Sequence, residues 1–263
     1  MSAIATVKSL WRYPVKSMAG EELNAAFLGF AGIYGDRFFA FISSAAPKGF
    51  PFFTAREQPD MLRYRPRFRS TDAASLPTNL SEAEKLAPGV TPVYPESADL
   101  MVDVLTPSGE TFAIDDSRLG QKLLEGLRDA PRLKLLRSDR ALTDCRPVSL
   151  FSVQTVEQLG QELHSTLDKR RFRANIYLDF RSARGFAEHE LVGKSLRMGE
   201  KSVVSILERD PRCKMITLDP DSCQSNPAIL RQVAQNHDGM AGVYAAVLVE
   251  GMVRAGDSVE LMD

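Results

Sequence analysis

Cysteine and histidine are scarce in this chain, which has 263 residues, three cysteines and three histidines. The cysteines, Cys145, Cys213 and Cys223, form no Cys-x-x-Cys pair, and the histidines form no His-x-x-x-His pair. The odd cysteine count argues against a disulfide framework. The missing spacings argue against a zinc site or an iron–sulfur cluster built from neighbouring ligands. A histidine-rich metal site has no support in the sequence either.

The sequence also lacks a long apolar run and an excess of charge of one sign. No segment approaches the roughly 20 apolar residues that span a bilayer, and the N-terminus shows no signal-peptide pattern. The formal net charge of −1, with 25% charged residues, gives no attraction to nucleic acid or to an anionic membrane. We therefore expect a cytoplasmic protein with no membrane or nucleic-acid partner.

Strand-like patterns dominate what is present and predict a β-rich α+β fold with curved sheets or barrels. Strands are expected within 5–15, 36–43, 99–114, 171–180, 194–210 and 241–261, because these segments alternate in polarity or form short apolar runs. Helices are expected over 116–128, 153–164 and 228–238. Residues 70–98, which are rich in Ser, Thr, Ala and Pro, predict an exposed loop with a short helix.

Cys213 lies between Arg212 and Lys214 and allows two interpretations. Neighbouring cations can lower the pKa of a thiol and favour the thiolate, which is the form that binds soft metals or attacks as a nucleophile. On a strand, however, adjacent side chains point to opposite faces, so both cations would face away from the thiol. An inert, buried cysteine is then the common alternative. Cys145 has a similar alternative, and Cys223 is expected to be an incidental surface residue.

Several polar residues could bind an anion. Lys16 and Ser17 follow the first strand, and a lysine, a hydroxyl and backbone N–H groups at a strand exit can hold a phosphate. Arg37 offers a planar guanidinium, although it could instead pair with Asp36, and Lys16 could be a solvated charge. No phosphate loop and no dinucleotide-binding glycine fingerprint occur, so an ordinary nucleotide-binding fold is disfavoured.

A second polar group lies in the strand expected over 171–180. Arg171, Arg173 and Asn175 alternate there and would share one face of the strand. From the residues alone, we infer an α+β protein with dispersed anion-binding candidates and one cysteine of interest.

The order of these motifs resembles the MOSC family, which is named for the C-terminal domain of molybdenum cofactor sulfurase. The resemblance covers nearly the whole chain and rests on eight segments: "YPVKSMAG" (13–20), "GIYGDRFFAFI" (32–42), "FTAREQP" (53–59), "CRPVSLFSVQTVEQL" (145–159), "RFRANIYLD" (171–179), "FAEHELVGKSLRMG" (186–199), "RCKMITLDPDS" (212–222) and "AGVYAAVLVEGMVRAGDSVEL" (241–261). It implies a MOSC N-terminal β-barrel domain over 1–125 and a MOSC domain with short helices over 126–263.

The resemblance also implies a cofactor and the residues that hold it. The functional relatives, the mitochondrial amidoxime reducing component and its bacterial counterparts, hold molybdenum–molybdopterin through one cysteine thiolate. Cys213 matches that catalytic metal ligand, a soft donor suited to the metal. The implied cofactor-binding residues are Lys16, Ser17, Arg37, Ser152, Thr155, Arg173 and Asn175. At the level of the whole family, pyridoxal phosphate binding is implied as well.

Two aspartates near Cys213 have two equally weighted roles. Asp219 and Asp221 either shape the loop that carries the cysteine or simply form a turn.

By resemblance, this chain is an oxidoreductase that reduces N-hydroxylated compounds such as amidoximes. Some relatives carry an additional 2Fe–2S domain, for which this sequence has no cysteines, so a separate electron-donor protein of ferredoxin, flavoprotein or cytochrome type is expected. The alternative function is a sulfur carrier or cofactor-binding protein with a persulfide on Cys213. The motifs that include Lys16 and Arg37 favour the oxidoreductase, because a sulfur carrier does not need them.

Overall fold

The computed structural model describes residues 3–262 except 73, 88, 89, 91, 93, 95–99, 139, 182 and 183. In the described residues the strands are β1 (Ala3–Arg12), β2 (Glu21–Leu23), β3 (Ala25–Gly29), β4 (Gly32–Ile33), β5 (Phe39–Ser43), β6 (Arg65–Phe68), β7 (Val102–Leu105), β8 (Thr111–Ala113), β9 (Leu133–Arg137), β10 (Val148–Ser152), β11 (Ile176–Phe180), β12 (Ser195–Met198), β13 (Ser202–Pro211), β14 (Met240–Val249), β15 (Gly251–Arg254) and β16 (Ser258–Met262).

The helices are short, as expected for this β-rich fold. The α-helices are α1 (Leu80–Ala83), α2 (Ser117–Leu124), α3 (Val153–Glu162) and α4 (Pro227–Asn236), and the 3₁₀ turns are η1 (Pro59–Arg63), η2 (Lys169–Phe172), η3 (Ala187–Leu191) and η4 (Lys214–Thr217). None of the helices in the described part of the chain is long and apolar enough to cross a membrane.

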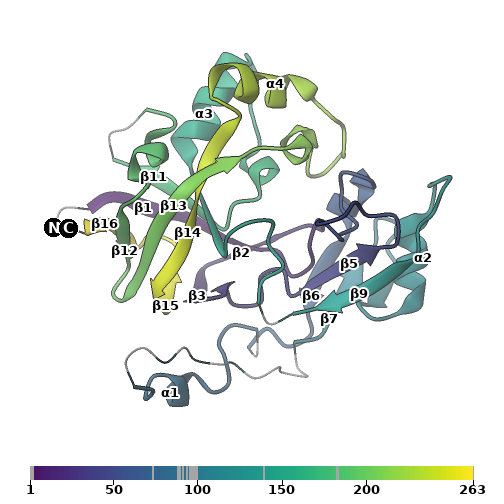
Figure 1. Ribbon diagram of the computed structural model, residues 1–263, viewed down its shortest axis with the longest axis horizontal. Helices are drawn as coiled ribbons and strands as arrows, with labels where there is room; N and C mark the ends of the chain where they lie inside the picture. Colours follow the sequence, from purple (N-terminus) through teal and green to yellow (C-terminus); the bar gives the residue numbers. More distant parts are fainter. Residues whose placement is uncertain are drawn as a thin grey trace.

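A closed barrel forms the larger part of the molecule. Its strands follow the order β1, β11, β10, β14, β13, β12 and β16, and β16 pairs with β1 again. Of these pairings only β10–β11 is parallel. Aliphatic side chains such as Leu150, Ile176 and Val204 point inward and are 0–1% exposed. In Figure 1 the barrel strands lie on one side, and α3 and α4 cover the barrel at the top.

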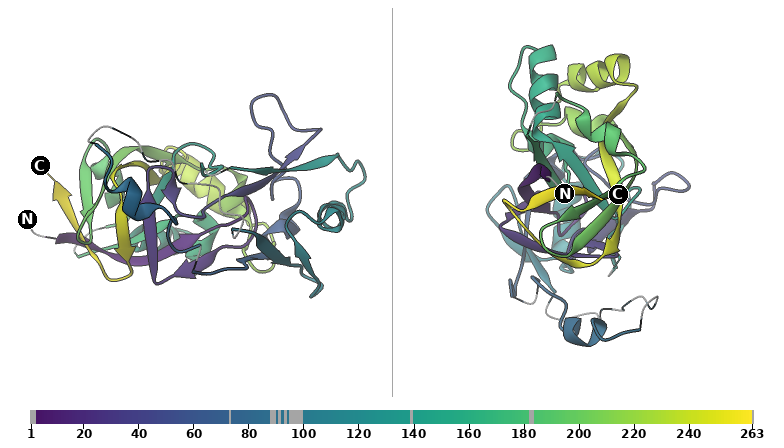
Figure 2. Two further views of the ribbon diagram at one scale, coloured as in Figure 1. Left: turned by 90° about the horizontal axis from the view of Figure 1, so that it is seen from below. Right: turned by 90° about the vertical axis from the view of Figure 1, so that its left-hand side faces the viewer.

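The five strands β5, β6, β7, β8 and β9, together with helix α2, form a second unit, which we call the side unit. It combines the β5–β9 pair with the β6–β7–β8 sheet around an aromatic and aliphatic core that includes Phe39, Met61 and Leu123. Figures 1 and 2 show the side unit at the opposite end of the molecule from the chain termini. The segment that leaves β1, Tyr13–Met18, passes directly from the barrel into the side unit, since Val15 forms a bridge with Phe39.

Helix ends follow local sequence rules. Asp116 caps α2 by accepting a hydrogen bond from the Arg118 backbone N–H, and Leu119 and Leu123 bury one face. Asn226 caps α4 in the same way, with Pro227 at its first position. These two helices, together with α3, the short helix in 70–98 and the strand pair within 99–114, confirm the predictions for those segments. The exposed loop that was also predicted within 70–98 lies partly outside the described residues.

One predicted strand is shorter than expected. The strand expected over 171–180 begins at Ile176, because residues 169–172 form η2 and Arg173 adopts a left-handed backbone with φ of 52°. The prediction that Arg171, Arg173 and Asn175 alternate along one strand face is therefore wrong. Their side chains are brought together by a turn.

The predicted domain boundary at residue 125 stays a prediction. The sheets, however, contain strands from both sides of it. Strand β1 lies between β11 and β16 of the barrel, and β9, from beyond the boundary, pairs with β5 of the side unit. Each half of the sequence thus completes a sheet of the other half.

We expect a fragment of residues 126–263 not to fold as a barrel, because without β1 the strands β11 and β16 lose their shared partner. Near-ultraviolet circular dichroism and thermal unfolding should show a cooperative transition for the full chain and none for the fragment. A fragment that unfolds cooperatively, with near-native side-chain signals, would contradict this expectation.

Candidate functional site

An open pocket lies where the barrel meets the side unit. Five segments form its walls: the residues that follow β1, the Thr54–Arg56 turn, the segment before β10, the turn between η2 and β11, and the end of β13. Its lining contains the cations Lys16, Arg37, Arg56, Arg146, Arg171, Arg173 and Arg212, and the carboxylates Asp144 and Asp210. Cys213 is the one thiol among the lining residues. We call this cavity the thiol pocket.

The structure brings most of the sequence-predicted site residues into the thiol pocket. The residues that line it are Lys16, Ser17, Arg37, Arg173, Asn175 and Cys213. Three of them, Ser17, Arg37 and Arg173, have left-handed backbones with φ of 66°, 49° and 52°. Such conformations cost a non-glycine residue roughly 1–2 kcal/mol and concentrate at functional sites, where surrounding contacts hold them.

Lys16 is buried and has partners within the protein. Its Nζ donates to the Leu142 carbonyl at 2.8 Å and to the Asp144 carboxylate. Burial lowers the pKa of Lys16, an effect that Asp144 opposes. Lys16 is the one lysine among the lining residues, and both of its contacts hold it against the segment before β10.

Two guanidinium groups flank the ring of Tyr13. Arg37 lies 4.7 Å from the ring centroid and Arg173 lies 4.3 Å from it. Arg37 also pairs with Asp36 and donates to the Arg173 carbonyl at 3.1 Å. Burial by itself would lower the pKa of Arg37, but Asp36 outweighs burial and the pKa is raised. The alternative expected from sequence, an Asp36–Arg37 ion pair, is therefore present within the pocket wall.

Arg173, like Arg56, has no carboxylate partner in the described part of the chain, whereas the other cations of the lining are paired. Burial lowers its pKa to about 10, and the nearby positive charge of Arg37 acts in the same direction. Arg173 is half-buried, and a cation partly withdrawn from water without a counter-ion is costly. An anionic ligand in the thiol pocket would remove that cost.

Cys213 lies after β13 rather than in a strand. Strand β13 ends at Pro211, and Cys213 is the N-terminal cap residue of η4. The prediction that Arg212 faces away from the thiol is wrong, since Arg212 and Cys213 both line the pocket. Arg212 pairs with Asp210 and donates to the Phe172 carbonyl at 2.6 Å. Lys214 leaves the pocket and donates to the Arg56 carbonyl.

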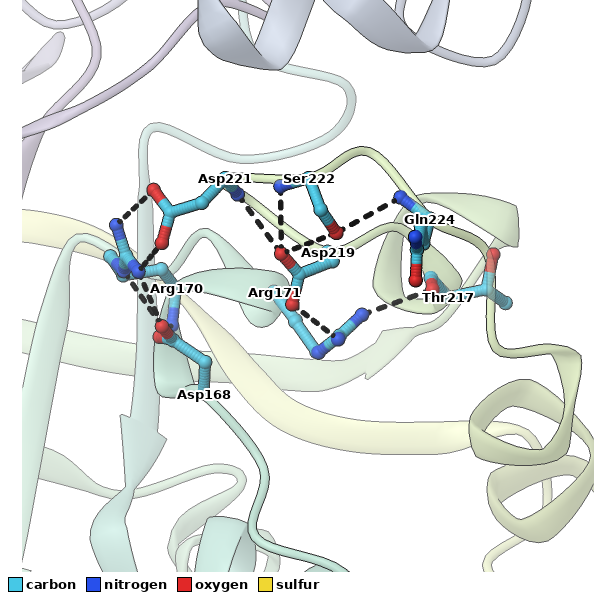
Figure 3. A network of polar contacts seen from close by, with 8 residues as sticks. All are labelled: Asp168, Arg170, Arg171, Thr217, Asp219, Asp221, Ser222 and Gln224. Carbon is cyan, nitrogen blue, oxygen red and sulfur yellow. Dashed lines mark hydrogen bonds and ion pairs between the residues drawn. The ribbon is translucent and has the colours of Figure 1, made fainter.

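A network of charged side chains fixes the segment that carries Cys213 (Figure 3). We call this segment, residues 212–224, the cysteine loop. Asp219 accepts hydrogen bonds from the backbone N–H groups of Asp221 and Ser222, and from Arg171 at 2.7 Å. Arg171 also donates to the Thr217 carbonyl at 3.0 Å. Asp219 therefore has both of its expected roles, because one carboxylate forms the turn and ties it to η2.

Asp221 has a more exposed role. It pairs with Arg170, which is also bound to Asp168, and these residues lie at the outer edge of the network in Figure 3. Because this pair is solvent-exposed, its contribution to stability is about 0–1 kcal/mol.

Asn175 lines the pocket, but its amide is used inside the fold. The side-chain oxygen accepts from the Ser149 backbone N–H and hydroxyl at 3.2 Å, and the side-chain nitrogen donates to the Trp11 carbonyl at 3.3 Å. Asn175 thus joins β1, β10 and β11 at the pocket wall.

Ser152 and Thr155 do not line the thiol pocket, and their role as cofactor-binding residues stays a prediction. Both are fully buried, and their hydroxyls lie 2.7–2.9 Å from the carboxylate of Glu188, which is also fully buried. Ser152 caps α3. The two residues therefore hold η3 against the start of α3. Burial raises the pKa of Glu188.

The other two cysteines lie outside the thiol pocket. Cys145 is exposed, and its thiol lies 3.3 Å from Glu208. Cys223 is half-buried against the side-unit core rather than on the surface, and burial raises the pKa of its thiol to about 11. Within the described residues, no group of three His, Cys, Asp or Glu side chains is arranged to hold a metal ion. A metal at Cys213 would need to bring other ligands with it.

Sequence reasoning missed several pocket residues, including Thr54, Arg56, Arg146, Asp210 and Tyr244. Thr54 and Arg56 lie in "FTAREQP", and Arg146 lies in "CRPVSL", both of which carried the family resemblance. Asp210 and Tyr244 belong to neighbouring barrel strands, and only the pairing of β13 with β14 brings them together.

The geometry defines a pocket lined by several cations and one thiol at the end of a β-barrel. Family models match the chain over residues 4–114, as a MOSC N-terminal beta barrel domain, and over residues 137–260, as a MOSC domain. The chain belongs to the MOSC family. A comparison with curated proteins finds no match.

Three bacterial proteins are among the solved structures to which the chain shows similarity. YUAD from Bacillus subtilis is 11% identical, with 98% of this chain and 94% of that chain covered and a TM-score of 0.47. YiiM from Geobacillus stearothermophilus and YiiM from Escherichia coli are each 17% identical, with TM-scores of 0.36 and 0.34. For both, the match covers 45% of this chain and 55% of the other chain.

The buried Glu188 cluster gives a prediction about stability. Glu188→Ala should lower the free energy of unfolding by about 3 kcal/mol, since it opens a cavity and removes the carboxylate that both the Ser152 and the Thr155 hydroxyl contact. Glu188→Gln keeps the volume and should cost much less. Chemical denaturation measures both, and Glu190→Gln, an exposed change on the same turn, is the control. Equal costs for Ala and Gln would contradict this role.

The raised pKa of Glu188 also sets the pH dependence. Below about pH 4, the ordinary pKa of Glu, the carboxyl is protonated in both the folded and the unfolded states. As the pH rises toward the raised native pKa, the unfolded state loses its proton first, so the wild type loses stability. Glu188→Gln cannot titrate, and its stability relative to wild type should therefore increase from pH 4 to pH 7.

The Asp219 contacts give a prediction about the thiol. In a Cys145→Ser/Cys223→Ser background, Asp219→Ala should increase the rate at which a thiol reagent labels Cys213 by about threefold or more, because the loop loses its tie to Arg171. Asp221→Ala removes only the exposed pair and serves as the control. An unchanged labelling rate in Asp219→Ala would show that this network does not restrain Cys213.

Proposed function

We propose that this protein is a molybdenum-cofactor-binding oxidoreductase that reduces N-hydroxylated compounds with electrons from a separate donor protein. The observation that carries the proposal is the meeting of one thiol with a cluster of cations, one of which, Arg173, has no carboxylate partner in the described part of the chain. Family membership supports a cofactor of this class, and the substrate class follows from the sequence resemblance to amidoxime-reducing proteins.

The residues of the thiol pocket fit a molybdenum–molybdopterin cofactor. Its phosphate and pterin ring need cations and hydrogen-bond donors, for which Arg173, Arg37 and Ser17 are suited. Because the protein supplies one soft donor, Cys213, the remaining soft ligands would come from the dithiolene of the pterin. When bound, the cofactor supplies a metal that changes oxidation state.

The chain itself would contribute binding and orientation. The left-handed backbones at Ser17 and Arg173 point two lining residues from separate segments into one cavity. Arg212 is held by Asp210, so its guanidinium stays in the lining beside Cys213. The Asp219–Arg171 contact keeps the cysteine loop against the pocket. We place the reaction in the cytoplasm, with a ferredoxin, flavoprotein or cytochrome as electron donor.

The first test is metal and pterin analysis of protein made in a host that synthesises the cofactor. Wild type and Cys145→Ala should each contain about one molybdenum per chain, while Cys213→Ala should lose the metal. Cys145→Ala is the matched control, because that thiol lies outside the thiol pocket. Samples with metal should reduce a benzamidoxime with a reduced dye as electron source.

Two further results complete the test. Arg173→Gln removes the unpaired charge and should lower pterin and molybdenum content together, whereas Cys213→Ala should retain pterin better than metal. Wild-type protein that lacks both pterin and metal in such a host would contradict the proposal. A persulfide on Cys213 in that sample, found by mass spectrometry, would instead indicate the sulfur-carrier alternative.

A further inference from the structure

A second cavity, of about 890 Å³, lies on another side of the junction between the barrel and the side unit. Strands β1 and β2 form one wall, and β6 with the turn between β7 and β8 forms another. We call it the arginine cleft. Small-molecule sites commonly have volumes of about 300–1,000 Å³ and are concave. The arginine cleft therefore has the size of a ligand site.

Strand β6 carries a row of arginines along the cleft. From residue 63 to residue 69 the side chains alternate between exposed arginine and buried apolar residue, in the sequence "RYRPRFR". The outer two arginines are paired, Arg63 with Asp60 at 3.5 Å and Arg69 with Asp103 at 2.7 Å. The inner two, Arg65 and Arg67, line the cleft, and no carboxylate among the described residues pairs with either.

The cleft also has apolar lining residues, some in the β1 wall and some beside the arginines, since Leu105 of β7 pairs with Arg65. Trp11, Leu62 and Leu105 contribute to its lining, and Trp11 is almost fully buried. Beneath the arginine row, buried Arg12 stacks over Phe68 at 4.7 Å and pairs with Glu21 at 2.8 Å. A ligand that combines a flat apolar part with an anionic part would use both features.

Arg173 connects the arginine cleft to the thiol pocket, because it lines both cavities. Its ring partner, Tyr13, lines the cleft. The charged network of Figure 3 also lies between the two cavities. Arg171 lines the thiol pocket, while Arg170 and Asp221 line the cleft. The two cavities thus share a wall of arginines.

We propose that the arginine cleft is a second ligand site, for a phosphate-bearing small molecule with a flat apolar part, such as a nucleoside phosphate. Arg65 and Arg67 would hold the phosphate groups, for which the planar guanidinium provides paired N–H donors. The apolar lining residues would contact the ring. This site does not depend on whether the thiol pocket binds a molybdenum cofactor.

A different role for the arginine row needs no ligand. Within the described residues β6 is an edge strand that pairs only with β7, and charges on an edge strand prevent unwanted strand pairing. That role explains exposed charge but not the concave, partly apolar surface that faces it. It predicts that the cleft binds no phosphate compound.

Isothermal titration calorimetry with ADP, pyrophosphate and adenosine, in magnesium-free buffer, tests the proposal on the full chain. ADP should bind to wild type at one site that depends on the cleft, and adenosine, which has no phosphate, should bind at least about tenfold more weakly. Arg65→Ala/Arg67→Ala should weaken ADP binding about tenfold or more. Arg231→Ala/Arg254→Ala removes the same charge from exposed positions outside both cavities and should leave it unchanged.

Three outcomes would overturn the inference. Absence of ADP and pyrophosphate binding to wild type would show that the arginine row acts only at the strand edge. Equal ADP affinity of wild type and Arg65→Ala/Arg67→Ala would place the bound phosphate elsewhere, as in the thiol pocket. Binding of a poly-glutamate peptide, without binding of ADP or pyrophosphate, would assign the arginines to an acidic protein partner. Circular dichroism of each variant confirms that it is folded.

Discussion

Strand β1 is hydrogen-bonded to a barrel strand on each side, and the rest of the structure depends on this constraint. β1 is paired with β11 along one edge and with β16 along the other, and this pairing closes the barrel. The same strand then leads directly into Lys16 and Ser17, which form part of the wall of the thiol pocket. Closure of the barrel and formation of the site therefore both depend on the position of β1. A displaced β1 would remove both.

The electrostatics of the site follow from this placement. Most cations in the thiol pocket are offset by a carboxylate that comes from a nearby turn, as in Arg37–Asp36, Arg212–Asp210 and Lys16–Asp144. Such pairs hold the side chains in place but add little net stability when buried, since desolvation offsets their attraction. Arg173 has no such pair among the described residues, so its charge remains available to a ligand.

The sequence predicted the barrel-rich fold and the helices because these depend on local patterns. Asp116 and Asn226 cap their helices through bonds to residues two positions away, and alternating polarity marked most strands. It failed where a distant partner decides the structure. The turn at Arg173 interrupts an apparently regular strand, and Ser152 and Thr155 are held by Glu188, more than 30 residues away. A hydroxyl that binds a buried carboxylate and one that binds a cofactor look alike in sequence.

The two cavities meet at one residue whose backbone conformation is itself unusual. Arg173 lies in the left-handed region directly after η2, and this turn directs its side chain to the boundary between the thiol pocket and the arginine cleft. A regular strand through residue 173 would have carried Arg173 along one face of the barrel wall. The short 3₁₀ turn therefore does more than shorten β11, because it allows one guanidinium to contribute charge to two neighbouring cavities. An anion in either cavity would act on the same charge, so binding in one cavity would change the affinity of the other without being required for it.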